Sequence, residues 1–287
     1  MSNTEASDGG KSAVSVSSLQ QDAGSVKWSQ PLIGGDVPSG RSGHTLTVLG
    51  DRAYMFGGCD ENLPPGPTNA LYRLKLCSPD SRQPMEWNQP RISGDPPMAR
   101  WLHSATAIDK FRILYFGGFH SDTNRFNDVN ILDTKAMMWS QPLGSMGDFT
   151  PRGNHIPTSN NSIAVPCPRG GHSANLINGE ILIFGGYGGS GYGRRDFNDI
   201  FRFNVSRFEW MKTPALKGKV PEGRSGHSAN VVKGKLFVFG GWNSQMQFND
   251  LNILSLDEDQ WTWSEANVDL GISRWCHTAV SVAAIPN

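Results

Sequence analysis

Long apolar runs, clustered cysteines and an excess of charge of one sign are all missing from this chain of 287 residues. No segment approaches the roughly 20 apolar residues that a membrane helix requires, and residues 1–25 lack the apolar core of a signal peptide. The 26 basic and 26 acidic residues balance, so no global charge attracts nucleic acid or an anionic lipid surface. We therefore expect neither nucleic acid nor a membrane as a partner.

The four cysteines are too widely spaced for a zinc knuckle or a disulfide-dense module, because no Cys-x-x-Cys pair occurs. They are Cys59, Cys77, Cys167 and Cys276. Reduced thiols and the missing leader favour a cytoplasmic protein, with a nuclear location as the alternative. Residues 1–25 are polar and rich in Ser, Gly and Asp, which predicts a disordered tail.

Glycine and proline are abundant, at 33 and 18 residues, which is typical of many short strands joined by tight turns. A Phe-Gly-Gly motif recurs four times, with its glycines at Gly57, Gly58, Gly117, Gly118, Gly185, Gly186, Gly240 and Gly241. An Arg-x-x-His motif precedes each pair, starting at Arg41, Arg100, Arg169 and Arg224. A fifth Arg-x-x-His starts at Arg274 and has no glycine pair after it.

Each repeat continues with an alternating segment, often opened by Asn-Asp, and ends on a tryptophan. The tryptophans are Trp87, Trp139, Trp210 and, in the fourth copy, Trp261 or Trp263. This pattern predicts four short strands per repeat, and such sheets are stable when radial packing covers both of their faces. The glycine pair then permits a positive φ or a close approach, and the tryptophan fills the wedge between sheets.

This motif series, from residue 26 to 283, resembles the kelch repeat family and implies an all-β fold, the kelch-type β-propeller. The expected full blades are residues 41–90, 100–143, 169–214 and 224–265. Residues 26–32 and 274–287 are expected to share an incomplete blade, with a C-terminal strand over 275–283. We further expect Asn287 to be a truncation point or an atypical end that leaves an open or strained ring with an exposed edge.

Partner binding is predicted on one propeller face, where variable loops follow the glycine pairs. The candidate residues are Arg41, Arg100, Trp101, Phe119, His120, Arg169, Tyr187, Arg194, Arg195, Arg224, Trp242, Arg274 and Trp275. The repeated arginines have two interpretations: they pair with the Asp of each Asn-Asp segment, or they line the mouth of the propeller. In kelch substrate adaptors of ubiquitin ligases, residues at matching positions help to bind acidic peptides, so the resemblance implies an acidic ligand.

The histidines of the repeat are predicted to serve local packing, because blade geometry spreads equivalent positions around a ring and away from one metal ion. The segment Gly186–Gly191 matches G-x-G-x-x-G but no helix follows it, so we do not expect a dinucleotide. Arg152–His155 resembles part of a metallophosphatase motif without the aspartates that would hold two metals. The long segment 144–168 around it is expected to be disordered, with a short recognition role.

These observations favour a non-catalytic interaction module, a scaffold or adaptor that binds another protein or peptide and carries no metal or other cofactor. Two alternatives stay open. One is a kelch-based metal enzyme of the galactose-oxidase or specifier type, although tyrosine is scarce at five residues and the cysteines fall at unrelated repeat positions. The other is the regulatory part of a larger enzyme.

Overall fold

Each repeat folds into one four-stranded antiparallel sheet in the computed structural model, which describes residues 31–62, 65–77, 83–142, 164–189, 193–257, 260–268 and 271–281. Blade 1 contains β3 (Thr45–Leu49), β4 (Arg52–Phe56), β7 (Leu71–Lys75) and β8 (Met85–Asn88). Blade 2 contains β9 (Ser104–Ala107), β10 (Arg112–Phe116), β11 (Val129–Asp133) and β12 (Met138–Ser140). Blade 3 contains β14 (Ser173–Ile177), β15 (Glu180–Phe184), β18 (Ile200–Asn204) and β19 (Glu209–Met211). Blade 4 contains β21 (Ser228–Val232), β22 (Lys235–Phe239), β23 (Leu251–Leu256) and β24 (Gln260–Glu265).

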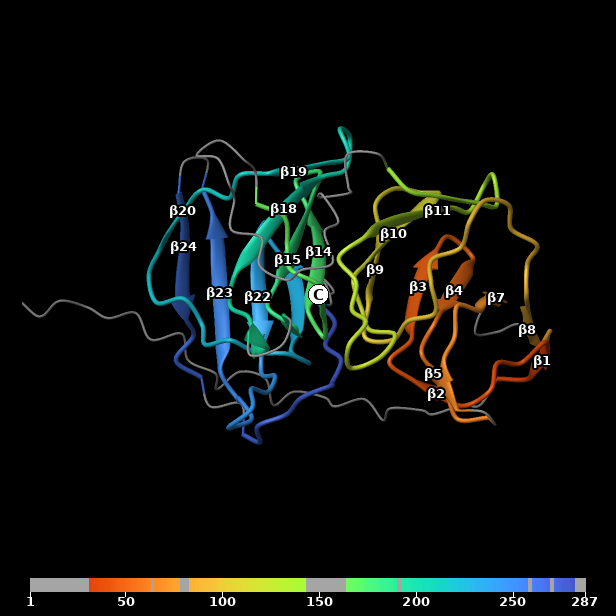
Figure 1. The fold of residues 1–287 in the computed structure, drawn as a ribbon, viewed down its shortest axis with the longest axis horizontal. Coiled ribbons are helices and arrows are strands. Elements are labelled where there is room, and N and C mark those ends of the chain that lie inside the picture. The colour runs from red at the N-terminus through yellow and green to blue at the C-terminus, as the bar shows by residue number, and fades with distance from the viewer. Residues whose placement is uncertain are drawn as a thin grey trace, which may run out of the picture. The chain divides into compact units, whose positions relative to one another are not determined.

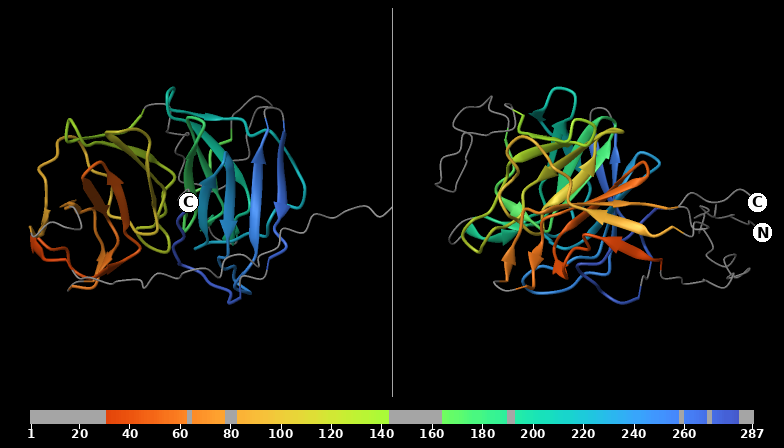
Figure 2. Two further views of the ribbon diagram at one scale, coloured as in Figure 1. Left: turned by 180° about the vertical axis from the view of Figure 1, so that it is seen from behind. Right: turned by 90° about the vertical axis from the view of Figure 1, so that its right-hand side faces the viewer.

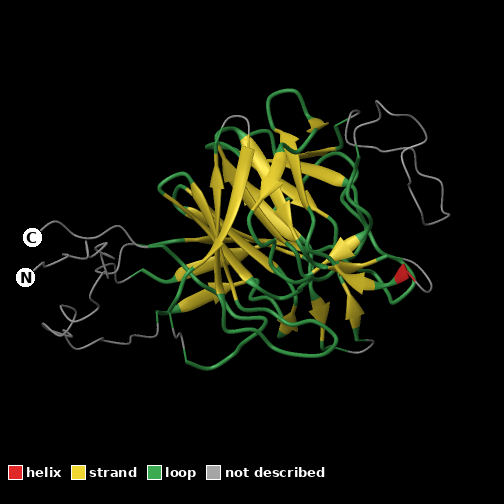
Figure 3. Ribbon diagram, turned by 90° about the vertical axis from the view of Figure 1, so that its left-hand side faces the viewer, coloured by secondary structure: helices red, strands yellow, loops and turns green. Residues whose placement is uncertain are grey.

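The blades follow one another in chain order, and their first strands, β3, β9, β14 and β21, contact their neighbours in turn (Figure 1). The view from behind shows the same succession (Figure 2). Strands and loops dominate the ribbon, and no α-helix occurs in the described ranges (Figure 3). Accordingly, no described helix could cross a membrane. The predicted all-β, kelch-type blade architecture is confirmed.

Two blades carry a fifth, parallel strand on their outer edge, which the sequence did not reveal. β1 (Ile33–Gly35) pairs with β8 of blade 1, and β20 (Ala215–Lys217) pairs with β24 of blade 4. In blade 2, Ser93 forms a single parallel bridge to Met138 at the same edge. β20 and Ser93 lie in segments that pass from one blade to the outside of the next, so there the crossover itself protects the sheet edge.

The predicted partial blade differs from the structure where it can be compared. Residues 26–30 lie outside the described part, as do 1–25, 144–163 and 282–287. Residues 31–32 are in no strand, and neither are residues 275–281, so the C-terminal strand is not formed over its described length. The reason is that every other first strand is held by a second strand that follows it, and the described residues after Arg274 supply none.

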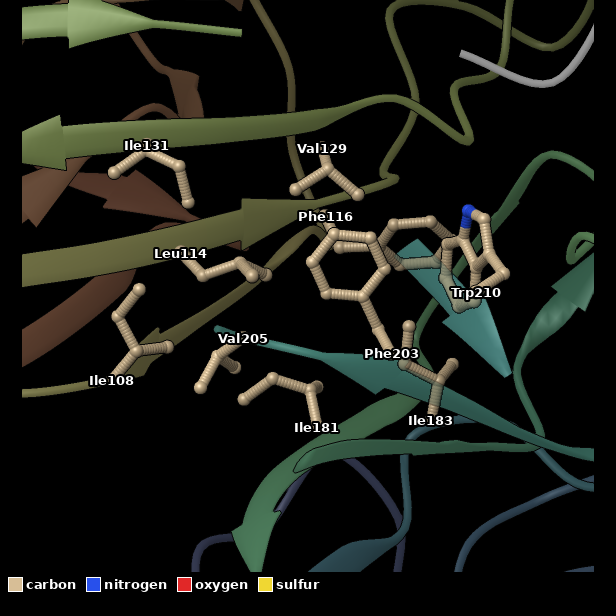
Figure 4. Packing of buried hydrophobic residues seen from close by; sticks show 10 residues of the cluster. All are labelled: Ile108, Leu114, Phe116, Val129, Ile131, Ile181, Ile183, Phe203, Val205 and Trp210. Atoms are coloured by element: carbon tan, nitrogen blue, oxygen red, sulfur yellow. The ribbon is translucent and has the colours of Figure 1, made fainter. Parts of the chain in front are cut away.

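Alternation along the strands sends side chains to both faces of each sheet, and the cores lie between neighbouring blades. Figure 4 shows the core between blades 2 and 3, where Leu114 and Phe116 of β10 meet Ile181 and Ile183 of β15. Trp210 of β19 packs against Phe116 with ring centroids 5.5 Å apart. The predicted wedge role of the repeated tryptophan is therefore seen directly.

The same contact recurs at the two other junctions. Trp139 packs against Phe56 at 5.2 Å, and Trp263 packs against Phe184 at 5.1 Å. In the fourth repeat the wedge residue is thus Trp263. Trp261, the other candidate, is also buried, but its ring lies under the guanidinium of Arg202.

The glycine pairs are required because the next repeat approaches them closely. Gly57 and Gly58 have φ of 68° and 91°, and a Cβ on Gly57 would lie 2.8 Å from Cε1 of His103. The N–H of Gly58 donates to the carbonyl of Arg100 at 2.9 Å. Each Arg-x-x-His motif from Arg100 onward therefore packs on, and is hydrogen-bonded to, the glycine pair of the preceding blade.

Candidate protein-interaction face

The loops that carry the predicted binding residues form a short ladder in each repeat. In blade 2, Phe119 bridges Trp101 on one side and Arg125 on the other. In the third repeat, β16 (Tyr187–Gly188) lies between β13 (Arg169–Gly170) and β17 (Arg195–Asp196). The first repeat has the same arrangement in β2 (Arg41–Ser42), β5 (Cys59–Asp60) and β6 (Gly66–Pro67). Equivalent positions after Arg and after Gly-Gly are therefore held side by side, repeat after repeat.

Three of the five motif arginines are buried and form ion pairs inside the protein. Arg100, Arg169 and Arg224 are at most 1% exposed. Arg100 donates to both carboxylate oxygens of Asp128, at 2.7 and 2.8 Å, and to the Gly117 carbonyl. Arg169–Asp199 and Arg224–Asp250 repeat this bidentate geometry. These three arginines therefore pair with the Asp of their Asn-Asp segments. The prediction that their guanidinium groups contact a partner directly is wrong, because burial leaves them no accessible donor.

The two outer members of the arginine series differ from these three. The Arg41 side chain is buried, and its Nη2 lies 3.3 Å from Oδ2 of Asp60 and donates a hydrogen bond to the Ser39 hydroxyl at 2.8 Å. Arg274 is exposed, and its Nε donates to the Ile272 carbonyl at 3.2 Å. Only Arg274 therefore presents its guanidinium to solvent.

The aromatic residues gather into two groups on the loop ladders. Trp101 meets Phe119 edge-on at 5.8 Å, and the Phe119 ring covers Gly170 of the next repeat. Trp242 and Trp275 lie 5.6 Å apart, with Trp275 half exposed. Because the next repeat has Gly170 at the contact, the Phe119 ring can lie across the junction between blades 2 and 3.

Arg125 is a site residue that the repeat pattern in the sequence did not single out. Its guanidinium lies 5.3 Å from the centroid of Phe119 and 5.2 Å from that of Tyr187, and its Nη1 donates to the Gly189 carbonyl at 2.7 Å. Its buried Nε has no hydrogen-bond partner, and within the described ranges no carboxylate is ion-paired to it. Burial, and then the neighbouring Arg194, lower the pKa of Arg125. The group is therefore a cation between two aromatic rings, and the nearby Asp122 and Tyr187 partly oppose the lowering of its pKa.

Arg194, Arg195 and His120 surround this group without forming a single cluster. Arg194 is exposed and donates to the Asp122 carbonyl at 3.0 Å, which ties the third-repeat loop to the second. Arg195 is exposed beside Phe197, at 5.4 Å from that ring. His120 is bonded through Nδ1 to the Ala99 carbonyl. Of the predicted residues, Phe119, Tyr187 and Arg194 are thus brought together around Arg125.

Asp196 adds a half-buried carboxylate to the same ladder, opposite Tyr187 in register. It accepts hydrogen bonds from the Ser225 hydroxyl at 2.9 Å and from the Ser244 N–H at 3.2 Å. Burial raises its pKa, although these bonds oppose the shift. The carboxylate links the loops of the third and fourth repeats.

The repeat histidines serve packing and are separated from one another along the blades. Three of them bond through Nε2 to a hydroxyl of the preceding blade: His103 to Thr45, His172 to Ser104 and His227 to Ser173, at 2.8–3.0 Å. Burial lowers the pKa of His103 and His227 to about 3. Within the described residues, no three His, Cys, Asp or Glu side chains are grouped closely enough to hold a metal ion.

Comparison with known proteins agrees with this architecture over nearly the whole chain. Residues 8–165 and 156–285 match the KLHDC2/KLHL20/DRC7 Kelch-repeats domain. The chain belongs to the kelch-repeat family. Kelch repeats generally mediate protein–protein interactions, and the kelch-domain relatives are mostly non-catalytic binding modules.

Individual relatives are longer than this kelch chain. It is 33% identical to Kelch domain-containing protein 3 of Rattus norvegicus over 227 residues, which is 77% of the chain and 52% of that protein. It is 30% identical to the flagellar outer arm dynein alpha chain of Chlamydomonas reinhardtii, over 83% of the chain and 5% of that protein. Host cell factor of Drosophila melanogaster is 28% identical, over 85% of the chain and 16% of that protein. The chain thus spans about half the length of these relatives, or less.

Proposed function

We propose that this kelch chain is a non-catalytic module, a scaffold or adaptor, that binds a partner protein through the loop ladders, and that Arg125 and Arg194 receive an acidic motif of that partner. The observation that carries the proposal is the partly exposed Arg125 guanidinium, which lies over Phe119 and Tyr187 and forms no ion pair with a described carboxylate. A carboxylate of the partner there would accept a charge-assisted hydrogen bond from the guanidinium.

The aromatic groups supply the apolar part of the same surface. Interfaces favour Trp, Tyr and Arg at their centres, and Trp101, Tyr187 and Trp242 are all partly exposed on adjoining ladders. The loop backbone also bears strain in two repeats, since Leu102 and Cys276 have φ of 53° and 51° where other repeats have Gly. A cytoplasmic or nuclear location belongs to this proposal, because all four cysteines are free thiols.

The test is selection from a random peptide display library, followed by anisotropy titration of a selected peptide. We expect wild-type protein to enrich peptides rich in Asp and Glu, and Arg125→Gln to weaken binding of such a peptide roughly tenfold or more. Arg207→Gln is the matched control, because Arg207 is exposed in the turn between β18 and β19. Enrichment without acidic residues, or undiminished binding by Arg125→Gln with its melting temperature unchanged, would refute the acidic-motif proposal.

A further inference from the structure

Blade 4 has one face that no described sheet covers. Along β22, Leu236 and Val238 are fully buried against blade 3, whereas Phe237 and Phe239, which point to the other side, are partly exposed. The equivalent residues of blade 3, Leu182 and Phe184, are 1% and 0% exposed because blade 4 covers them. The face lines a groove of about 320 Å³ whose walls include Phe237, Phe239, Leu251 and Ser228.

The other three junctions show what this groove is shaped to receive. At each of them the phenylalanine before the glycine pair contacts two rings of the next blade, a histidine and a tryptophan: His103 and Trp139 on Phe56, His172 and Trp210 on Phe116, and His227 and Trp263 on Phe184. Phe239 has its histidine, His277, at 5.0 Å. Within the described residues no tryptophan packs against Phe239, so the fourth junction has half of its aromatic contacts.

The complementary surface lies on blade 1, at the start of the described sheets. Trp87 of β8 is the blade 1 equivalent of Trp139, Trp210 and Trp263, and in the described part its ring contact is with Tyr72 of its own sheet, at 6.4 Å. Leu46 and Val48 of β3, which share the outward face, are each 54% exposed. Their blade 3 equivalents, Ala174 and Leu176, pack against blade 2. Blade 1 therefore presents a surface that is buried in the later repeats.

We propose that in solution the uncovered face of blade 4 in one copy binds the uncovered face of blade 1 in a second copy of this chain, with Trp87 entering the groove beside Phe239. The argument is continuity: the contact would repeat a junction that the chain already makes three times between its own blades. The two faces differ from each other, so the association is heterologous and runs head to tail. Apolar faces of this kind are otherwise exposed to unspecific association.

The experiment measures the mass of the 287-residue protein by sedimentation equilibrium over a range of concentrations. Phe237→Asp places a charge on the blade 4 face, and Val48→Asp places one on the blade 1 face. We expect the wild-type mass to rise with concentration from that of one chain to at least that of two, and each variant alone to keep the mass of one chain. Mixed together, the variants retain one intact face each, so they are expected to form a one-to-one complex.

Phe111→Asp is the matched control, because Phe111 is 49% exposed in the turn before β10, away from both faces. It should associate as wild type does, and circular dichroism should show all three variants folded. A wild-type protein that keeps the mass of one chain at every concentration overturns the proposal, which is also the outcome expected if another sheet covers these faces. Association that survives in either face variant, or a mixture that forms no complex, overturns it equally.

Discussion

At the scale of single residues, the buried motif arginine connects two blades. Its guanidinium donates hydrogen bonds to the Asp that precedes the third strand of its own blade. Its backbone carbonyl accepts a hydrogen bond from the second glycine of the pair in the preceding blade. The same side chain also lies over a phenylalanine, as Arg224 does over Phe248 at 4.1 Å. One residue therefore ties the loop to its own blade and to the previous one.

Removing the counter-charge of such an arginine should be costly. In Asp250→Asn, the buried guanidinium of Arg224 loses its carboxylate, and we expect the free energy of unfolding to fall by about 3 kcal/mol in urea titrations. Glu209→Gln, at the exposed pair with Arg207, should change it by less than about 1 kcal/mol. Equal effects of the two substitutions would show that burial does not decide the strength of these pairs.

The sequence predicted the shared residues well and the unshared ones poorly. The motif glycines, tryptophans and histidines recur in every full copy, so self-comparison finds them, and strand geometry explains the packing of those in blades 2–4. The sequence left two interpretations of the motif arginines, because their burial depends on tertiary contact with the Asp of the Asn-Asp segment, which the sequence does not show. Arg125 was missed because it belongs to one repeat alone, and its environment is created by Phe119 of its own loop and Tyr187 of the next blade.

At the scale of elements, the least predictable strands are the parallel edge segments β1 and β20. They are three residues long, and tertiary contact with the fourth strand of a blade, more than local propensity, fixes them. A glycine lies at the end of each edge strand. Gly35 is the last residue of β1, and Gly218 follows β20, with φ of 79° and 77°. Gly94 occupies the equivalent place in blade 2.

These glycines are required by close approach as well as by conformation. A Cβ on Gly218 would collide with the backbone carbonyl oxygen of Trp263, whereas a Cβ on Gly50, at φ 60°, would meet nothing within 4 Å. We expect Gly50→Ala to cost about 1 kcal/mol from the positive φ alone. Gly218→Ala should cost about 1–3 kcal/mol more, because backbone must move. Chemical denaturation of both variants measures the difference, and equal losses would mean that the edge segment is loosely held.

At the scale of the whole molecule, neighbouring blades are joined by the same device at each junction. A neutral histidine, buried beside a phenylalanine, bonds a hydroxyl of the preceding first strand, and the last such pair joins His277 to Ser228 at 2.9 Å. His103 lies near Arg100 and His44, and His227 near Arg224, His277 and Asp250. Burial is the main cause of the lowered pKa of both, and the nearby arginine is the next. The junctions therefore resist protonation together.

This resistance predicts how stability depends on pH. Well above pH 6.5 the histidines are neutral in both folded and unfolded chains, so they leave the free energy of unfolding nearly flat between pH 7 and 8. Below that pH the unfolded chain binds protons that the folded one refuses until about pH 3, so the free energy of unfolding falls as pH falls. The expected slope is about 1.4 kcal/mol per pH unit for each buried histidine.

Urea unfolding at pH 7, 6 and 5 measures this slope in a window where lowered-pKa carboxyls such as Asp250 stay ionised. Since His103, His172 and His227 are all buried with lowered pKa, wild-type protein should approach about 4 kcal/mol per pH unit near pH 5. His227→Asn removes one of these protons, so its slope should be smaller by about a third, whatever the substitution costs at pH 7. A slope that His227→Asn leaves intact would mean that protons enter the folded junction between blades 3 and 4, and that this histidine is not sealed between them.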